Sequence, residues 1–247
     1  MMRTLPIGTI LYRITFEQAT WPDVISGEGA FFSDGSRYNR THQTTVYASE
    51  DPIVSLTEMA FHQAHYWFGV LSRKQPKRET SGFITNHRLW AFRLVESIAV
   101  LDILDPAAYH RLRYLPSEVC TPERDYSVTQ TIGDVVRSPS FSDRNPVHGI
   151  LAPSVRTPAS ETYRPQQVVL FVRKKRLAVR KVRVWDVILE FMDRFTQEAV
   201  TIESTRIDWT HPRFRLAGTR SIPAFQGRDS PVDFPLDTWH NLVVQFA

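Results

Sequence analysis

The chain has 247 residues, 42% of them apolar and 23% charged, which is the composition of a folded globular protein and excludes disorder over the whole length. Its formal charge of +4 is too small to predict nucleic-acid binding. The single cysteine, Cys120, excludes an intrachain disulfide and a cysteine-rich zinc site. No apolar run approaches the length of a membrane span, and the N-terminus is too weakly apolar for a signal peptide. We therefore expect a cytoplasmic protein that does not use a membrane; delivery into a target cell would also fit this composition.

Basic residues cluster in two segments. Residues 173–183 hold seven Lys or Arg among eleven positions and no acid, and residues 72–88 form a second basic stretch that we interpret as a loop. Runs of like charge are usually solvated, and Lys and Arg also protect the edges of sheets. We favour this interpretation over an anionic partner, so nucleic acid is not expected to bind.

Strands dominate the first part of the chain. Residues 9–14 alternate in polarity as a half-buried strand does. A glycine-rich stretch follows at 26–39, and residues 44–49 then have the β-branched and aromatic content of a second strand.

The clearest helix signal lies at residues 49–69. Ser49 or Asp51 can cap its start, Pro52 suits the first turn and Gly69 can end it. Apolar side chains at helical spacing predict a buried stripe of Ile53, Leu56, Ala60 and Ala64. Glu58 lies off this stripe.

Further strands and two helices are predicted up to residue 173. The strands are expected at 89–95, 97–104, 148–156 and 166–173. The helices are expected after Pro106 and across 125–137.

The pattern weakens beyond residue 175, where we place a domain boundary. Residues 185–200 have apolar side chains at helical spacing and predict an amphipathic helix, whereas 201–209 alternate as a strand does. The chain thus divides into a main domain, 1–175, and a C-terminal extension, 176–247, expected to pack on it.

Four polar residues lie where a ligand could bind. Arg37 lies in a glycine-flanked turn, Tyr47 within a strand, Glu58 in the early turns of a helix and Ser154 directly after an apolar strand. Taken singly, each is better explained as a surface cation, a core aromatic, a solvated helix residue or a turn cap.

Several familiar templates are absent from the sequence. It contains no phosphate-binding or dinucleotide-binding glycine motif, no zinc-protease motif and no serine-hydrolase elbow. His62 and His65 are three residues apart but lack a third ligand, so we expect no metal site.

Taken together, the motifs resemble the RES-domain family over residues 8–173. The first half has a Tyr-Arg strand, Gly-Glu-Gly-Ala, Gly-x-Arg-aromatic-Asn, Val-Tyr-x-Ser and Leu-x-Glu, in that order. The second half has Thr-Gln-Thr-Ile-Gly-Asp at 129–134, Gly-Ile-Leu-Ala-Pro-Ser-Val-Arg at 149–156 and an apolar Val-Val-Leu-Phe strand at 168–171. Two positions depart from the family pattern, since Ser36 and Tyr38 stand where it usually has Gly and Trp.

The resemblance implies a mixed α/β domain with an ADP-ribosyltransferase-like fold, in which two small packed β-sheets surround a nucleotide cleft. It implies that residues 1–175 bind NAD⁺ as a substrate and that residues 176–247 are an extension without a family counterpart. The family's Arg, Tyr, Glu and Ser carry over to Arg37, Tyr47, Glu58 and Ser154 as catalytic residues. Arg13 and Asn39 are implied to help Arg37, Tyr47 and Ser154 bind NAD⁺.

Three functions are compatible with these residues. The first is a toxin that cleaves the nicotinamide–ribose bond of NAD⁺ as a glycohydrolase or phosphorylase, neutralised by a cognate antitoxin protein. The second is a protein mono-ADP-ribosyltransferase, which needs a protein acceptor. The third is an inactive domain that binds a nucleotide or a partner; retention of all four polar residues argues against it. A fixed carboxylate beside the ribose would stabilise the oxocarbenium-like transition state, as in glycoside hydrolysis, which is the role expected of Glu58.

Overall fold

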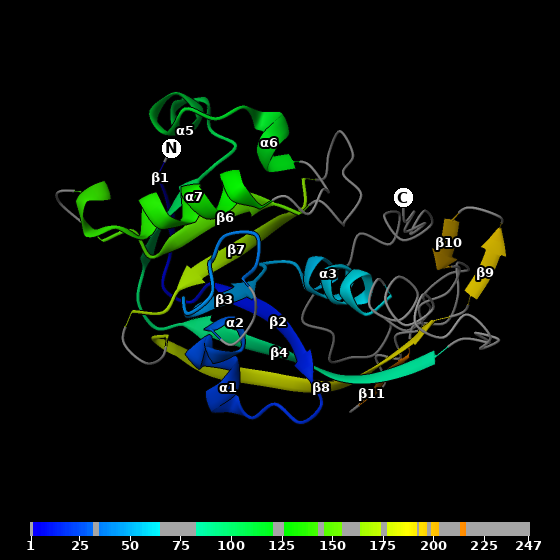
Figure 1. Ribbon diagram of the computed structural model, residues 1–247. Helices are drawn as coiled ribbons and strands as arrows, with labels where there is room; N and C mark the ends of the chain where they lie inside the picture. Colours follow the sequence, from blue (N-terminus) through cyan, green and yellow to red (C-terminus); the bar gives the residue numbers. More distant parts are fainter. Residues whose placement is uncertain are drawn as a thin grey trace.

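The computed structural model describes residues 2–31, 35–64, 83–120, 126–142, 146–154, 164–173, 177–191, 193–196, 199–202 and 213–215. These residues form a mixed α/β fold with two main sheets (Figure 1), which confirms the predicted fold class. The strands are β1 (Met2–Leu5), β2 (Ile10–Phe16), β3 (Thr45–Ala48), β4 (Phe83–Leu94), β5 (Ile98–Asp102), β6 (Gly149–Pro153), β7 (Gln166–Phe171), β8 (Val179–Phe191), β9 (Asp193–Thr196), β10 (Ala199–Ile202) and β11 (Arg213–Arg215). The helices are α1 (Trp21–Ser26), α2 (Glu28–Phe31), α3 (Pro52–Ala64), α5 (Pro106–Leu112), α6 (Pro116–Cys120) and α7 (Ser127–Arg137).

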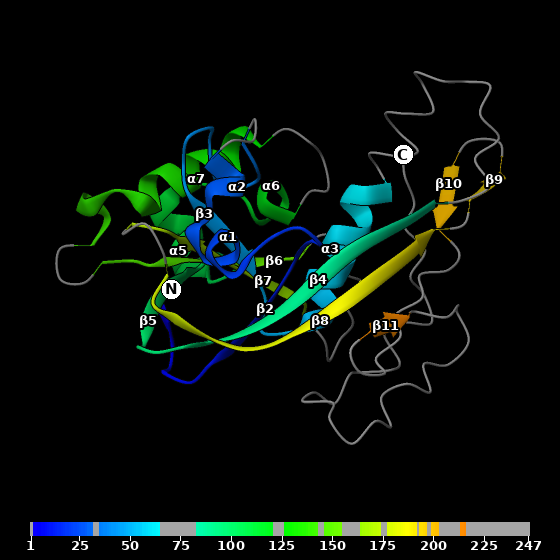
Figure 2. The same cartoon turned by 90° about the horizontal axis from the view of Figure 1, so that it is seen from below.

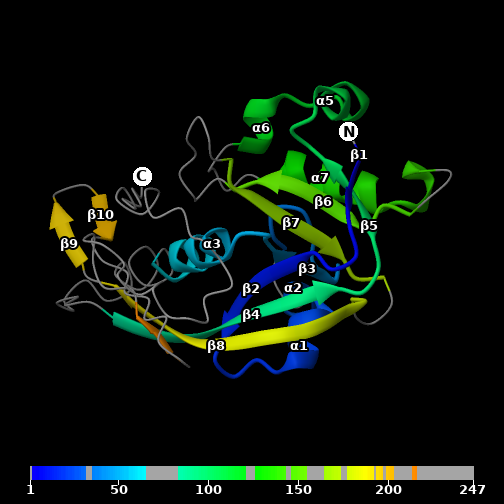
Figure 3. The same cartoon turned by 180° about the vertical axis from the view of Figure 1, so that it is seen from behind.

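One sheet has five strands in the order β1-β5-β6-β7-β3. Only β5 and β6 are parallel, and the other neighbours are antiparallel. The view from behind shows β1 beside β5 at one edge (Figure 3). Side chains alternate between two apolar clusters: Val168 and Leu170 of β7 face one, and Val169 and Phe171 face the other. The sheet is therefore buried on both faces, which is why its central strands read as continuous apolar runs.

The other sheet has four strands in the order β11-β8-β4-β2. β4 pairs antiparallel with both β2 and β8, and it continues with β8 as a long two-stranded ribbon beyond the end of β2 (Figure 2). A further pair, β9 and β10, is antiparallel.

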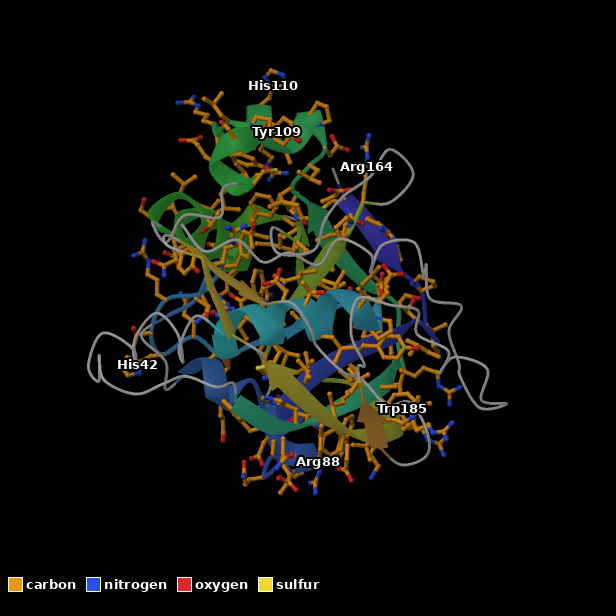
Figure 4. The ribbon with its side chains drawn as sticks, turned by 90° about the vertical axis from the view of Figure 1, so that its right-hand side faces the viewer. His42, Arg88, Tyr109, His110, Arg164 and Trp185 are labelled. Atoms are coloured by element: carbon orange, nitrogen blue, oxygen red, sulfur yellow. The ribbon has the colours of Figure 1, made fainter. Side chains whose placement is uncertain are left out.

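The two sheets pack on one another through a shared core. Leu11 of β2 and Phe92 of β4 meet Val100, Val168 and other side chains of the five-stranded sheet. Helices α5, α6 and α7 cover the opposite face of that sheet (Figure 1). Side chains in Figure 4 show the same layering: Tyr109 and His110 lie on the helical side, and Arg88 and Trp185 lie on the side of the four-stranded sheet.

Local capping explains where two of the helices begin. Helix α3 starts at Pro52, as predicted, because the Asp51 carboxylate accepts from the backbone N–H of Ile53 at 2.8 Å. Of its predicted stripe, Ile53 and Leu56 are buried; the side chains of Ala60 and Ala64, like Gly69, lie outside what the structure describes. Helix α1 was not predicted. A capping box starts it, in which Asp23 accepts from the Thr20 backbone at 2.7 Å.

The structure corrects the loop that the sequence predicted at residues 83–88. They were assigned to the loop 72–88 but form the first half of β4, where they pair with β8. The remainder of that loop lies outside the described residues.

The structure also corrects the helix predicted at 185–200, because residues 185–191, 193–196 and 199–200, the described part of this range, are in strands. Residues up to Phe191 belong to β8, followed by β9. Trp185 and Val187 are buried, whereas Val182 and Val184 are exposed, which is the period of a strand. The apolar residues of this segment fit both periods, and pairing with β4 selects the strand. Of the strand predicted at 201–209, only the first two residues are described, as the end of β10.

The domain boundary near residue 175 stays a prediction. Beyond it, β8 pairs along nearly the whole of β4, so at least residues 179–191 belong to the same sheet as β2. Residues 242–246, Leu-Val-Val-Gln-Phe, also have the pattern of a strand, and they lie outside the described part of the chain. Among the helices that the structure does describe, none has the length and apolar character needed to cross a membrane.

Two valines test the strand assignment of β8. Val187→Ala should lower the free energy of unfolding by about 2 kcal/mol, because that side chain is only 1% exposed. Val184→Ala should cost less than about 1 kcal/mol, because it removes a half-exposed group. Urea denaturation measures both. In a helix, residues three apart share a face, so equal losses for the two variants would contradict the strand.

Candidate active site

The candidate site is a cavity of about 410 Å³ between the two sheets and α3. Its wall includes Arg13 from β2, Arg37 from the turn before β3, Tyr47 from β3 and Glu58 from α3. Ser154, at the end of β6, does not line the cavity, although its hydroxyl reaches Glu58. The sequence separation of these residues shows that the fold, rather than any local motif, brings them together.

A hydrogen bond fixes the Glu58 carboxylate. The Ser154 hydroxyl donates to Oε1 of Glu58 at 2.7 Å, and the Ser154 backbone N–H donates to the Pro165 carbonyl at 2.9 Å. Helix α3 is itself attached to β2, since the Ser55 hydroxyl donates to the Tyr12 carbonyl at 2.8 Å. The carboxylate is thus held from a helix on one side and from a strand end on the other.

The turn at residues 35–39 presents Arg37 to the cavity. It is closed by two backbone hydrogen bonds between Ser36 and Asn39, at 2.9 and 3.3 Å. Gly35 has a φ of 95°, and a Cβ there would lie 2.9 Å from the Asn39 carbonyl, so a glycine is required. Ser36 has no positive φ, which explains how this position tolerates a serine.

Tyr47 contributes both to the cavity wall and to this turn. The residue lines the cavity, and its hydroxyl donates to the Asn39 side chain at 2.8 Å and accepts from the Tyr38 backbone N–H at 2.9 Å. Burial raises the pKa of Tyr47 well above its ordinary value, so the hydroxyl keeps its proton at neutral pH.

Asn39 and Tyr38 lie behind the turn. The Asn39 side chain is fully buried and donates to the Ala30 and Arg40 carbonyls at 3.4 and 3.1 Å. Tyr38 is also fully buried and belongs to the core beneath the helices, so an aromatic at this position serves packing. Neither side chain is part of the cavity wall.

Two arginines make the cavity cationic. The Arg13 guanidinium donates to the Val24 carbonyl, and burial lowers its pKa to about 10, so it stays charged at neutral pH. Among the described residues, no carboxylate pairs with Arg13. Arg37 donates to the Val119 carbonyl at 3.1 Å, and its guanidinium lies 5.9 Å from the centre of the Tyr126 ring. The neighbouring Cys120 is exposed, and partial desolvation raises the pKa of its thiol.

Sequence reasoning did not identify several other residues of the wall. They include Ser55, Met59, His62, Tyr126 and Gln167. Ser55 and His62 lie three and four residues from Glu58 on α3, a spacing that places them on one helix face and could have identified them. Tyr126 and Gln167 carried no such signal, because their proximity depends on tertiary packing. No group of three or more potential metal ligands occurs within the described ranges.

Comparisons with known proteins point to one family. The model of the RES domain matches residues 10–191. Among solved structures, the MbcT–MbcA toxin–antitoxin complex of M. tuberculosis contains a similar chain, with a TM-score of 0.50 and 18% sequence identity over 74% of this chain and 86% of that one. At this identity the similarity concerns the fold. A comparison with curated protein sequences gave no match.

Removing one oxygen from Tyr47 tests how the turn is held. Tyr47→Phe keeps the ring but leaves the Tyr38 N–H without its acceptor and the Asn39 side chain without its donor. The loss should lower the free energy of unfolding by about 1–3 kcal/mol, the usual cost of buried polar groups left unpaired. Chemical denaturation measures it, with Tyr109→Phe as the control, since among the described residues that hydroxyl makes one hydrogen bond, to the part-buried Leu104 carbonyl. Equal stability of Tyr47→Phe and the wild type would show that this hydroxyl does not hold the turn.

Proposed function

The chain belongs to the RES domain family, as its motifs predicted, and from this premise we propose that it is a toxin-like enzyme that cleaves the nicotinamide–ribose bond of NAD⁺. The observation that carries the proposal is the Glu58 carboxylate, held by Ser154 at 2.7 Å in a cavity that also contains Arg13 and Arg37. One anionic group and two cationic groups then face the same bound molecule.

Glu58 supplies the negative charge that this reaction needs. As the bond to nicotinamide breaks, positive charge develops on the ribose ring, and a preorganised carboxylate stabilises that charge. Ser154 occupies one carboxylate oxygen, which restricts the carboxylate to one orientation. In this orientation the carboxylate is proposed to face the ribose or to accept from one of its hydroxyls.

Arg13 and Arg37 are proposed to bind the pyrophosphate. A guanidinium presents several donors in a fixed plane that matches phosphate oxygens. Arg13 is hydrogen-bonded to a backbone carbonyl, which leaves its charge to be neutralised by a ligand. A dianionic pyrophosphate meets that requirement.

Tyr47 is proposed to offer its ring to the nicotinamide, which is a flat aromatic ring that carries a positive charge in NAD⁺. Its hydroxyl is already engaged by the turn, so the ring cannot rotate away without breaking two hydrogen bonds. Asn39 was expected to bind NAD⁺ directly. Because it is fully buried behind the turn, we now propose that it positions Tyr47 and Arg37 instead.

The acceptor of ADP-ribose decides between the candidate reactions. Water makes the protein a glycohydrolase, inorganic phosphate makes it a phosphorylase, and a side chain of another protein makes it a mono-ADP-ribosyltransferase. Incubation of the purified protein with NAD⁺, with and without phosphate, followed by mass spectrometry, separates ADP-ribose, ADP-ribose-1″-phosphate and a modified protein. Intact NAD⁺ under all of these conditions would overturn the proposal.

A cognate antitoxin is part of the proposal. The similar solved chain is a toxin in complex with an antitoxin, and free NAD⁺-degrading activity would harm the cell that makes it. The partner is therefore expected to be a protein that blocks the cavity or its entrance.

Glu58→Gln tests the carboxylate. The variant keeps the size and hydrogen-bonding reach of the side chain but loses its charge, so kcat should fall by about 10²–10³-fold while NAD⁺ binding persists. Steady-state kinetics and calorimetry of NAD⁺ binding measure the two effects. Glu17→Gln, an exposed change outside the cavity, is the control. Near wild-type kcat in Glu58→Gln would show that this residue is structural.

Arg37→Ala tests the phosphate role. The pyrophosphate is charged before and during bond cleavage, so losing its partner should raise KM by about tenfold or more and change kcat little. Arg93→Ala, an exposed change outside the cavity, is the control, and circular dichroism checks the fold. If Arg37→Ala lowers kcat at unchanged KM, the guanidinium acts at the reacting centre instead.

A further inference from the structure

Helix α7 holds the turn that carries Arg37. The side-chain amide of Gln130 donates to the Ser36 carbonyl at 3.2 Å and to the Asn39 carbonyl at 3.3 Å. These two carbonyls stand on either side of Arg37 in the chain. One amide group therefore spans the base of the turn from which the arginine projects.

The next turn of α7 makes further contacts on the same face. A Cβ on Gly133 would lie 2.3 Å from the Tyr38 carbonyl, so the helix backbone directly abuts the turn. The Asp134 carboxylate accepts from Arg40 at 2.6 Å and from Gln43 at 2.7 Å. Positions 130, 133 and 134 share one helix face, which is occupied by the backbone and side chains of residues 36–43.

The start of α7 also reaches the far end of Arg37. Tyr126 precedes the helix, and its ring lies 5.9 Å from the Arg37 guanidinium. The Gln130 backbone N–H donates to the Tyr126 carbonyl at 2.7 Å. A single helical turn thus contacts both the origin of the arginine side chain and its charged end.

We propose that Gln130 is a positioning residue that fixes the direction of Arg37, and that it acts on substrate binding without touching the substrate. This inference rests on the proposed function, in which Arg37 binds the pyrophosphate. A primary amide suits the role because its two N–H groups serve two carbonyls at once, whereas a carboxylate of the same shape would face both carbonyl oxygens with a negative charge. Gln130 is not part of the cavity wall, so a direct contact with the ligand is not its role.

Two variants of Gln130 test the proposal. Gln130→Glu keeps the size of the side chain and removes both donors, and Gln130→Ala removes the group while leaving a good helix former. Thr131→Ala is the matched control, because the Thr131 hydroxyl donates at 2.7 Å to Ser127 within the same helix. All variants are first checked by circular dichroism.

The first measurement does not depend on NAD⁺. Hydrogen exchange followed by mass spectrometry should be faster over residues 35–40 in both Gln130 variants and unchanged in Thr131→Ala. Unchanged exchange over these residues would overturn the proposal. A wild-type protein that leaves NAD⁺ intact would overturn the proposed function instead, and the exchange result would still decide whether Gln130 holds the turn.

The second measurement separates positioning from general stability. Gln130→Ala should raise KM for NAD⁺ by about tenfold, the effect of one or two lost hydrogen bonds, with kcat changed less than about threefold. In the Arg37→Ala variant, adding Gln130→Ala should not raise KM any further, because the arginine to be positioned is absent. Full additivity of the two changes in KM, or a loss confined to kcat, would overturn the role assigned to Gln130.

Discussion

The burial of β6 and β7 on both faces is the constraint on which the rest of the fold depends. Each strand must be covered twice, once by the four-stranded sheet, whose β2 carries Arg13, and once by the helices, where Tyr126 directly precedes α7. Close packing reaches the backbone at Gly149, where a Cβ would lie 2.1 Å from the Val169 carbonyl. Ser154 directly follows β6 and is therefore placed by a strand that is packed on both faces.

The charged groups of the site differ in how they are held. Glu58 is fixed by a side chain, whereas Arg13 and Arg37 are hydrogen-bonded to the carbonyls of Val24 and Val119. A carbonyl orients a guanidinium without neutralising it. The carboxylate and the two cations thus line one cavity, which suits a substrate with a cationic reacting centre and an anionic tail.

Local patterns explain what the sequence could predict. β3 was expected from its β-branched and aromatic content and β6 and β7 from short apolar runs, whereas α1 was missed because six residues are too few for a periodic signal. Residues 185–200 fit two periods, and only their pairing with β4 selects the strand. For the site, the order of motifs predicted Arg37, Tyr47, Glu58 and Ser154. It could not assign the Tyr47 hydroxyl to the turn or Gln130 to its base, since both depend on contacts between distant segments.

The exposed thiol of Cys120 offers a direct means of observing the site. It is the only cysteine of the chain, and it follows the residue whose carbonyl accepts from Arg37. A maleimide fluorophore would therefore attach at one position, beside the arginine, in the wild-type protein. Because the thiol pKa is raised, labelling is favoured at mildly alkaline pH. Such a conjugate would convert occupancy of the cavity, by nucleotide or by protein, into an optical signal without any engineered cysteine.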